Sequence, residues 1–413
     1  MPDLKTLLLD IVVVCSVARA LGWGFEKLGQ PRVVGEMFAG ILLGPSLLGW
    51  LAPSVFASLF PAGGLAPLYF LSQIGLLLFM FQVGVGLDLD EVRKMGRAVV
   101  LTSNISVLVP LVAGSTLAIY LYPRLSDAKV ALPVFALFMG TAMSITAFPV
   151  LARILEERNL LQSPVGMVAI SCAAVDDITA WCLLAGLIGW VHSGTVASPW
   201  LTLAGLIAYL AVMTWVVRPL LGRYSAFKQE SSRETIAFAV LFLFLSAWTT
   251  ERIGIHALFG AFFAGAIWPR SEGFSRNLTS YLGTITGVLL LPLFFATTGL
   301  RTSVHLLTGG TLWFYCALIV LVAILGKLFG CAVAARASGM SWDNALSVGV
   351  LMNTRGLIEL VILNVGLDLG VISPTLFSMM VIMALVTTFM TTPALSLLSR
   401  SVTASVKPKP VTS

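Results

Sequence analysis

Two adjacent carboxylates, Asp176 and Asp177, stand in the middle of the segment Ser171–Trp181 of the sequence. They lie in an apolar run from about residue 164 to residue 190, and a run of this length crosses a bilayer as one helix. An ionised side chain near the bilayer centre costs roughly 2.5–3.5 kcal/mol on insertion scales, and each carboxylate makes ionisation of the other harder. Packing does not explain such a pair, so we expect it to form a site for a cation or a proton.

The chemistry of such a site follows from its ligands. A small alkali cation needs hard oxygen ligands, which Asp176 and Asp177 supply together with backbone carbonyls released where a membrane helix is interrupted. The same carboxylates bind protons, so cation and proton compete for one site. If the site faces one side of the membrane at a time and moves only when it is occupied, exchange of the two results without a separate coupling device.

Lys327, Arg355 and Glu359 are charged residues that two other apolar segments bring to a depth similar to that of the aspartates. Glu359 follows Arg355 by four residues, which places the two on the same face of a helix. The simplest arrangement pairs Lys327 with one aspartate and Arg355 with Glu359 or with the carbonyl end of a half-helix. These five charges sum to −1, which leaves one carboxylate for a transported cation or proton.

Two apolar segments carry helix-interrupting residues at their centres, in Ser144–Pro149 and in Met352–Gly356. Proline and glycine free backbone groups there, and those groups need a cavity or another partner inside a membrane. An ordinary proline kink would explain the first segment alone, but the paired placement favours two broken helices whose ends present partial charges at the midplane. The residues expected to line the resulting cavity are Ser144, Thr146, Asn353 and Thr354.

The composition is that of a polytopic all-α membrane protein. Of 413 residues, 58% are hydrophobic and 11% are charged, whereas a soluble chain has about 25% charged residues; the mean hydropathy is +0.97. The net charge of +6 does not indicate a nucleic-acid partner, because the basic residues fall in short loops. The five cysteines lie in apolar segments without a C-x-x-C motif, which favours neither disulfides nor zinc. We expect no cofactor, no catalytic residues and hence no enzyme.

Thirteen membrane spans are predicted, the first as a retained helix rather than a signal peptide. Their approximate ranges are 5–27, 32–51, 65–87, 97–122, 131–154, 163–190, 199–222, 234–252, 255–270, 278–300, 311–337, 342–366 and 374–399. With this count, five Lys and Arg residues fall on the side of the N-terminus and seventeen on the other. The asymmetry predicts an outside N-terminus and a cytoplasmic C-terminus in the cell inner (plasma) membrane.

An internal repeat is visible in short motifs seven spans apart. Gly35–Gly40 resembles Gly260–Gly265, and Leu77–Leu87, with Gly86, resembles Leu290–Leu300, with Gly299. Because seven is odd, the two copies run in opposite directions through the membrane. The sequence therefore predicts an inverted repeat, spans one to six against spans eight to thirteen, which is typical of secondary transporters.

Taken together, these motifs resemble the monovalent cation:proton antiporter-2 family over nearly the whole chain. The segments that carry the resemblance are Gly35–Pro45, Thr146–Pro149, Val175–Asp177, Leu293–Leu300 and Asn353–Leu360. The resemblance implies a 13-helix fold in which a core domain moves elevator-fashion against a dimerisation scaffold, and it implies a homodimer. It also matches Asp177 to the ion-carrying aspartate of the family, Asp176 to its partner, and Lys327 to the lysine that pairs with that partner.

By order of spans, the resemblance assigns residues 1–92 and 230–305 to the dimerisation scaffold and residues 93–195 and 306–400 to the ion-translocating core. Residues 196–229 would form a connecting helix, and residues 401–413 a short cytoplasmic tail without a soluble regulatory domain. The expected partners are monovalent cations, protons, membrane lipid and a second copy of the chain, in a role such as pH homeostasis.

The choice of cation stays open between Na⁺, with possible Li⁺ transport, and K⁺. The Asp176–Asp177 pair with Lys327 resembles electrogenic sodium/proton exchangers, and it lacks the Gln-Asp of glutathione-gated potassium efflux systems. In contrast, Asn353–Glu359 resembles plant cation/proton exchangers, which are linked to potassium. It departs from the Arg-Gly-Glu spacing expected of sodium-type bacterial exchangers.

Three functions of other classes compete with antiport. A channel would need filter loops or charged rings, which are absent from the sequence. An intramembrane aspartyl protease needs carboxylates from different helices, whereas Asp176 and Asp177 are neighbours about 100° apart on one helix. A sodium-coupled solute symporter on a related inverted-repeat fold remains an alternative.

Overall fold

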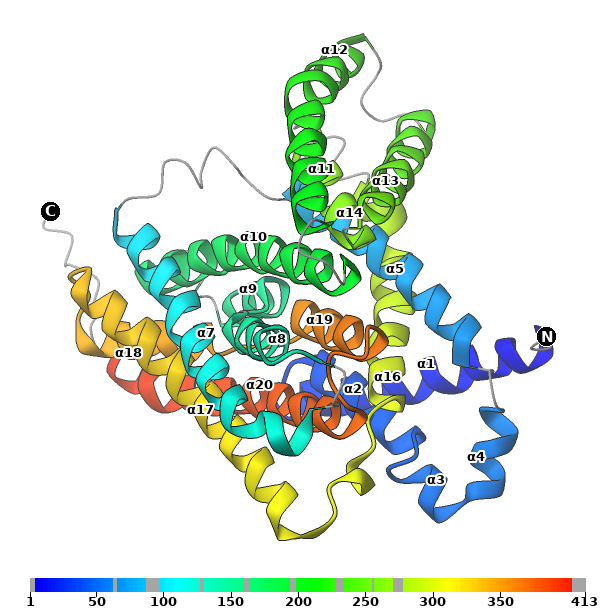
Figure 1. Cartoon of the computed structure of the whole chain (residues 1–413), viewed down its shortest axis with the longest axis vertical. Coiled ribbons are helices and arrows are strands. Elements are labelled where there is room, and N and C mark those ends of the chain that lie inside the picture. The colour runs from blue at the N-terminus through cyan, green and yellow to red at the C-terminus, as the bar shows by residue number, and fades with distance from the viewer. Residues whose placement is uncertain are drawn as a thin grey trace, which may run out of the picture. The chain divides into compact units, whose positions relative to one another are not determined.

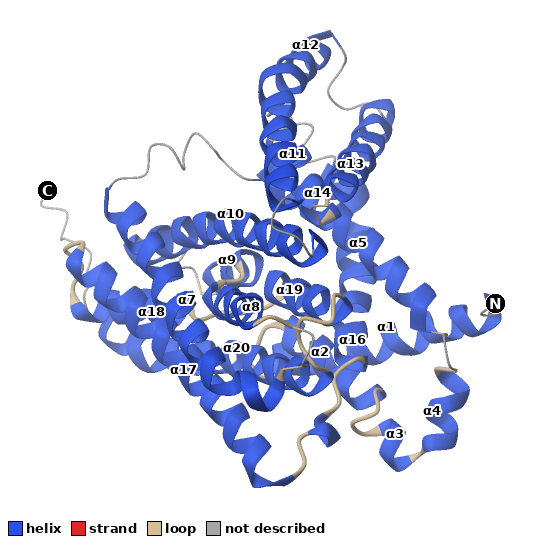
Figure 2. Ribbon diagram, viewed as in Figure 1, coloured by secondary structure: helices blue, strands red, loops and turns tan. Residues whose placement is uncertain are grey.

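The computed structural model is helical throughout the part of the chain that it describes, with no strand there (Figure 2). That part comprises residues 4–61, 65–86, 97–126, 130–158, 160, 163–193, 198–227, 233–254, 256–269 and 278–402. Within it, nine helical segments are long and apolar enough to cross a membrane. They are Arg32–Leu51, Leu65–Gly86, Val99–Leu125, Pro164–Leu184, Ala204–Arg223, Glu234–Ile253, Tyr281–Leu306, Gly309–Ala337 and Pro374–Leu398. The prediction of an all-helical membrane protein is confirmed, while the count of thirteen spans stays a prediction.

Four predicted spans fall outside these nine segments. The span at 5–27 is the helix α1 (Leu4–Lys27), which carries five charged residues. The span at 255–270 contains α14 (Ala257–Ala266), whose ten residues rise only about 15 Å. The spans at 131–154 and 342–366 are each interrupted in the middle.

The chain folds into two compact units, of which the first comprises Met1–Leu21, Gly35–Arg93 and Trp181–Thr302. Besides most of α1 and all of α14, its helices are α2 (Arg32–Leu43), α3 (Leu48–Leu51), α4 (Pro53–Leu59), α5 (Leu65–Gly86), α11 (Ser198–Val212), α12 (Arg218–Phe227), α13 (Arg233–Ile253) and α16 (Leu291–Leu300). Short π-helical stretches at Met213–Val217, Thr279–Gly283 and Thr286–Leu290 precede α12 and α16. Apolar side chains from α1, α2, α5 and α16, together with Phe60 at the end of α4, form one of its cores.

Two helix pairs of this unit touch through glycines. A Cβ atom built on Gly40 of α2 would collide with the backbone carbonyl of Ala296 in α16, and one built on Gly299 of α16 would collide with the backbone of α2 at Met37. Backbones approach this closely only where a side chain is missing. The contact between α2 and α16 therefore depends on Gly40 and Gly299.

The contact between α14 and α5 has the same form. A Cβ atom on Gly265 would collide with the carbonyl of Phe81, and one on Gly84 would collide with the carbonyl of Phe262. In the short sequence motifs, Gly265 is matched with Gly40, and Gly86 is matched with Gly299. In the structure, however, Gly265 lies against Gly84, which is two residues before Gly86. A Cβ atom on Gly86 would meet open space, so Gly84 makes the close approach, and the inverted repeat itself stays a prediction.

The second unit comprises Gly22–Val34, Lys94–Ala180 and Ser303–Ser413. Its helices are α7 (Arg97–Leu125), α8 (Leu132–Ser144), α9 (Phe148–Glu157), the first part of α10 (Pro164–Ser193), the 3₁₀ turn η4 (Val304–Leu306), α17 (Gly309–Ala337), α18 (Trp342–Met352), α19 (Leu357–Asp368) and α20 (Pro374–Val402). α7 packs along both α8 and α17, and α17 packs along α18 (Figure 1). The predicted tail lies outside the described residues from residue 403 onward, and the predicted domain boundaries stay a prediction.

Two interruptions of the helices lie within this unit. Residues 145–147 separate α8 from α9, and residues 353–356 separate α18 from α19. Because α9 begins at Phe148, Pro149 falls in its first turn, where a helix needs no N–H donor. The two interruptions are hydrogen-bonded to each other, since the N–H of Ala147 donates to the carbonyl of Thr354 at 3.0 Å. The broken helices predicted from the proline and glycine positions are therefore present.

Candidate functional site

Asp176 is buried on α10 and surrounded by donors. Its Oδ2 lies 2.7 Å from the Nζ of Lys327, and both side chains are fully buried. The same Oδ2 is 3.1 Å from the hydroxyl of Thr146, in the first interruption. Its Oδ1 is 2.8 Å from the hydroxyl of Ser106 and 3.4 Å from that of Ser103, both on α7. Asp176 is thus held in place by donors from α7, α17 and the interrupted segment.

Lys327 reaches this carboxylate from the middle of α17. An ammonium group has three donors, and here all three have acceptors. Besides Asp176, they are the carbonyl of Ser106 at 3.0 Å and the carbonyl of Ser144, the last residue of α8. A positive charge at the C-terminal end of a helix is favourable because the free carbonyls there are partly negative. Lys327 therefore compensates both the carboxylate and the end of α8.

Asp177 has a different environment, although it is the next residue along the chain. The backbone N–H of Phe148, the first residue of α9, donates a hydrogen bond to its carboxylate. The side chain is buried, and its Oδ1 has no hydrogen-bond partner among the residues that the structure describes. A buried carboxylate oxygen without a donor is costly, so Asp177 has ligand capacity that the protein itself leaves unused.

Arg355 and Glu359 form a second buried ion pair, with 3.3 Å between an Arg355 Nη and the Oε1 of Glu359. The guanidinium also donates to the carbonyls of Ala142 at 3.0 Å and Met143 at 2.7 Å, near the end of α8. Both side chains keep one unsatisfied atom, Arg355 Nε and Glu359 Oε2, among the described residues. Arg355 therefore joins the second interruption to the end of the first half-helix.

The four residues expected to line a cavity are all buried beside the two interruptions. The hydroxyl of Thr146 lies 2.8 Å from the carbonyl of Met352, the last residue of α18, so it can donate either there or to Asp176. The Ser144 hydroxyl donates to its own helix, at the carbonyl of Thr141. The hydroxyl of Thr354 lies 3.5 Å from that of Thr391 on α20.

Asn353 completes this set. Its amide nitrogen is 3.7 Å from the sulfur of Met390, while its Oδ1 has no hydrogen-bond partner among the described residues. An unused amide oxygen beside an interrupted helix is a hard oxygen ligand of the kind that the sequence predicts there. No group of three His, Cys, Asp or Glu side chains within the described ranges could hold a resident metal ion.

Sequence reasoning missed three residues that complete the arrangement. Ser103 and Ser106 hold Asp176, and their spacing of three places both hydroxyls on one face of α7, a pattern that could have been noticed in an apolar span. Thr388 of α20 accepts from the N–H of Arg355 at 3.1 Å and donates to its carbonyl at 2.7 Å. Nothing in the sequence distinguishes Thr388 from the neighbouring threonines of α20.

Comparison with known proteins places this arrangement in a family. Residues 12–399 match the family described as sodium/hydrogen exchanger, transmembrane. The Na⁺/H⁺ antiporter NhaS4 of Synechocystis is 45% identical over 95% of this chain and 97% of its own length. Cation/H⁺ antiporter 19 of Arabidopsis thaliana is 39% identical, and K⁺/H⁺ antiporter 1 of Saccharomyces cerevisiae is 32% identical.

The match to the plant and yeast proteins covers 96% and 93% of this chain but only 50% and 45% of theirs. The chain thus spans about half the length of these two relatives. Among solved structures, the sodium proton antiporter MjNhaP1 of Methanocaldococcus jannaschii superposes with a TM-score of 0.68 over 98% of this chain and 99% of that one. At 15% sequence identity, this likeness concerns the fold.

Proposed function

We propose that this chain, which belongs to the sodium/hydrogen exchanger family, is a secondary active antiporter. It exchanges Na⁺, with Li⁺ as a further substrate, for H⁺ across a membrane through the carboxylate of Asp177. Asp176 orients the site, while Lys327, Arg355 and Glu359 balance its charge.

The unequal environment of the two aspartates is the observation that carries this proposal. Asp176 and Lys327 cancel each other's charge, and Arg355 and Glu359 do the same. Asp177 remains as the one buried carboxylate of this group without a cationic partner at contact distance among the described residues. A lone buried negative charge is unstable, so Asp177 favours a state in which a proton or a cation neutralises it.

Exchange follows from competition at this carboxylate. A proton on Asp177 and a cation bound to it exclude each other, so each neutral form carries one substrate. Further oxygens for a cation would come from the unused Oδ1 of Asn353 and the hydroxyl of Thr146, both buried beside the two interruptions. The N-terminal end of α9 faces Asp177 and stabilises its ionised form when the cation replaces the proton.

The architecture that we propose has thirteen membrane helices in two inverted six-helix repeats. The matching glycine contacts of α2 with α16 and of α14 with α5 support the repeat, because the second span of each proposed repeat meets the third span of the other repeat in the same way. The second unit would act as the core that moves elevator-fashion. The first unit would form the scaffold and the homodimer, with the N-terminus outside and the C-terminus in the cytoplasm.

Potassium is the second candidate substrate, and a specific sequence supports it. The segment Asn353–Glu359 resembles plant cation/proton exchangers, and one yeast relative is named a K⁺/H⁺ antiporter. Transport of K⁺ would use the same Asp177 site.

Proton movement in proteoliposomes with an imposed pH gradient tests the function. Addition of Na⁺, Li⁺, K⁺ or choline should collapse the gradient only for transported alkali cations, and the half-maximal concentrations rank them. If no alkali cation collapses the gradient while an organic solute is accumulated with Na⁺, the antiporter proposal fails in favour of a symporter.

A further inference from the structure

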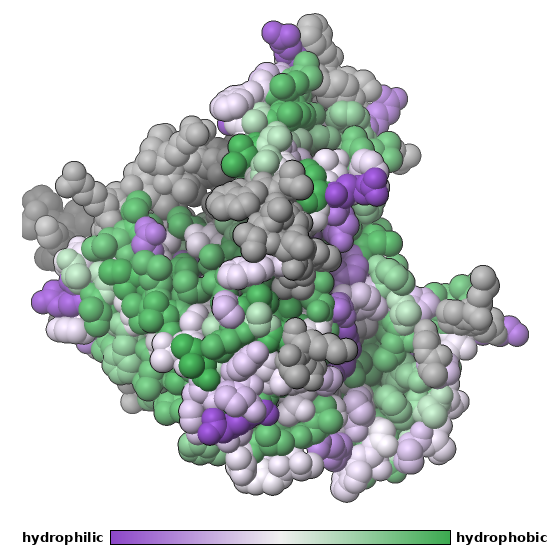
Figure 3. All heavy atoms as spheres, in the orientation of Figure 1, coloured by the Kyte–Doolittle hydropathy of each residue, from purple (hydrophilic) through white to green (hydrophobic). Residues whose placement is uncertain are grey.

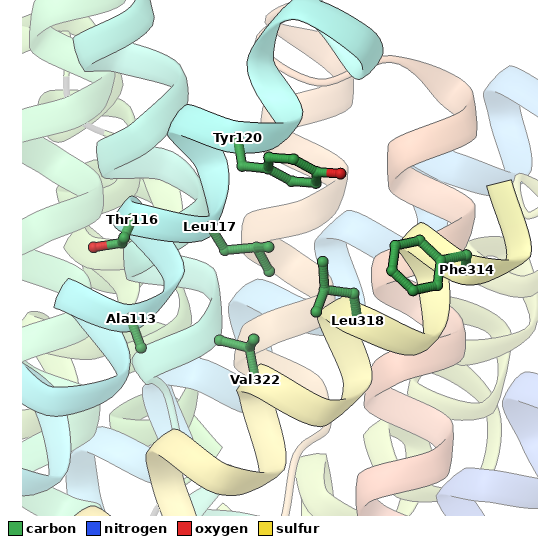
Figure 4. Close-up of a pocket in the computed structure, with 7 residues that line it drawn as sticks. All are labelled: Ala113, Thr116, Leu117, Tyr120, Phe314, Leu318 and Val322. Carbon is green, nitrogen blue, oxygen red and sulfur yellow. The ribbon is translucent and has the colours of Figure 1, made fainter. Parts of the chain in front are cut away.

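α7 and α17 leave an apolar groove on the surface of the second unit, beyond the ion site along both helices. It has a volume of about 600 Å³, and Figure 4 shows the side chains that line it. The residues that line it are Ala113, Thr116, Leu117 and Tyr120 of α7 and Phe314, Leu318 and Val322 of α17. The Thr116 hydroxyl already donates to the carbonyl of Val112, so apolar contact dominates the lining.

The groove closes at one end because the two helices come together there. A Cβ atom on Gly326 of α17 would lie 3.4 Å from the backbone of Pro110 and 3.7 Å from Ala113, and one on Gly330 would lie 3.1 Å from Val109. The closed end is therefore one residue away from Lys327. Towards the other end, the rings of Tyr120 and Tyr315 span the gap, with 6.2 Å between their centroids.

A cation stands at this aromatic end. The guanidinium of Arg124 lies 4.3 Å from the ring centroid of Tyr120 and 5.9 Å from that of Tyr315, and it donates to the carbonyl of Tyr120 at 2.6 Å. The side chain is exposed, and no carboxylate pairs with it in the described part of the chain. Among the described residues, the hydrogen bond to the Tyr120 carbonyl occupies one of its five donors.

We propose that this groove binds one acyl chain of an anionic phospholipid, with the lipid phosphate at Arg124. The charge of the groove favours this occupant, since the groove is an apolar channel that ends at the guanidinium of Arg124 and the rings of Tyr120 and Tyr315. Such an order of apolar, aromatic and basic groups matches a lipid across the membrane interface. The surrounding surface of α7 and α17 is largely hydrophobic as well (Figure 3).

A lipid here would act on the two helices that hold Asp176. α7 carries the hydroxyls of Ser103 and Ser106, and α17 carries Lys327. An acyl chain between them fixes their separation at the open end, while the contact at Gly326 fixes it at the closed end. The effect on transport rests on the proposed antiport, but the binding of the lipid does not.

Lipid retention by the purified full chain tests the binding directly. After delipidation, the protein is mixed with phosphatidylglycerol or phosphatidylcholine, and bound lipid is counted by native mass spectrometry. Arg124→Gln removes the cation and Leu318→Trp fills the groove. The matched controls are Arg336→Gln, an exposed arginine over the ring of Trp342 on the same unit, and Leu321→Trp, an exposed position of α17 outside the lining.

The parent protein should retain phosphatidylglycerol about fivefold more than phosphatidylcholine. Arg124→Gln should abolish that preference, Leu318→Trp should remove one lipid of either class, and both controls should behave as the parent protein. Equal retention of the two lipids by the parent protein would mean annular lipid only and overturn the site. A change of oligomeric state in Leu318→Trp would instead identify the groove as a protein interface and also overturn it.

The consequence for transport is measured separately in liposomes with and without phosphatidylglycerol. Antiport by the parent protein should rise with that lipid, and antiport by Arg124→Gln should not. If the parent protein binds the lipid but moves no alkali cation, the proposed function has failed and the lipid site stands. If it transports but shows no lipid preference, the lipid site has failed alone.

Discussion

Asp176 and Asp177 are neighbours on α10, but their carboxylates have different numbers of hydrogen-bond and ion-pair partners. Asp176 has four donors within 3.4 Å, one of them the ammonium of Lys327. Asp177 has a backbone N–H and an unused oxygen. At the scale of the residue, this difference supports the proposal that Asp176 organises the site and that Asp177 exchanges its ligand.

Replacing Lys327 by Gln should shift the pH profile of antiport to higher pH. The nearby cation favours the ionised carboxylates, so its removal makes a proton at the site harder to release and more alkaline conditions are needed. Antiport rates measured from pH 6 to 9 check this, with Arg336→Gln at the exposed end of the same helix as the control. An unchanged profile would show that Lys327 does not set the charge of the site.

The charged residues of the candidate site were predictable from the sequence, because charged residues are rare in membrane spans. Asp176, Asp177, Lys327, Arg355 and Glu359 stand out because burial of each is costly. The sequence predicted that Lys327 pairs with one of the two aspartates but not with which one, since the spacing along the chain does not determine which aspartate Lys327 contacts. Hydroxyl donors such as Ser103 were missed because serine is ordinary in a membrane helix, where it can bond to its own backbone.

At the scale of the element, the two interrupted helices stabilise each other's ends. Arg355, beside the second interruption, binds carbonyls at the end of α8, and Thr146 of the first interruption can donate to the end of α18. The backbones also bond directly, from Ala147 to Thr354. Each interruption would leave buried carbonyls unpaired by itself, so the two broken helices require each other.

Arg355→Gln should therefore lower the free energy of unfolding by about 3–5 kcal/mol, because it leaves Glu359 charged and unpaired in the interior. The pair replaced together, as Arg355→Met with Glu359→Leu, should lose less than Arg355→Gln alone. Thermal unfolding of the purified variants in one detergent gives the comparison. A double variant that is less stable than Arg355→Gln would mean that the carbonyls of α8, rather than the ion pair, decide the loss.

Proline and glycine made the interruptions predictable, but not the lengths of the elements around them. The second and ninth predicted spans begin near Arg32 and His256, and the continuous helices there are only α2 and α14. Hydropathy gives the length of an apolar stretch of sequence. The length of the helix depends instead on which backbone groups can form hydrogen bonds with neighbouring elements.

At the scale of the whole molecule, two similar glycine contacts support the proposed inverted repeat. Gly40 with Gly299 and Gly265 with Gly84 make equivalent approaches in two helix pairs of the first unit. The contact between α14 and α5 was not predictable from the sequence, because two glycines, Gly84 and Gly86, stand near the end of α5 and either could have made the contact. The packing of α14 against Phe81 selects Gly84.

Gly40→Ala and Gly265→Ala should each destabilise the protein, by about 1–3 kcal/mol, since each added methyl meets a backbone carbonyl that cannot move aside easily. Gly186→Ala is the matched control, because its methyl would meet open space. Thermal unfolding in detergent is again the measurement. A loss at only one of the two sites would contradict the equivalence of the two contacts.

The exchange of a proton for a cation at Asp177 is tested most directly by comparing Asp177→Asn with the parent protein in proteoliposomes that hold a pH gradient. Asp343→Asn, at the first turn of α18, serves as the control for loss of a carboxylate. We predict that Na⁺ or K⁺ collapses the gradient with the parent protein and with Asp343→Asn, and that no alkali cation does so with Asp177→Asn at any pH from 6 to 9. Cation-driven proton movement that persists in Asp177→Asn would contradict the role of this carboxylate as the exchange site.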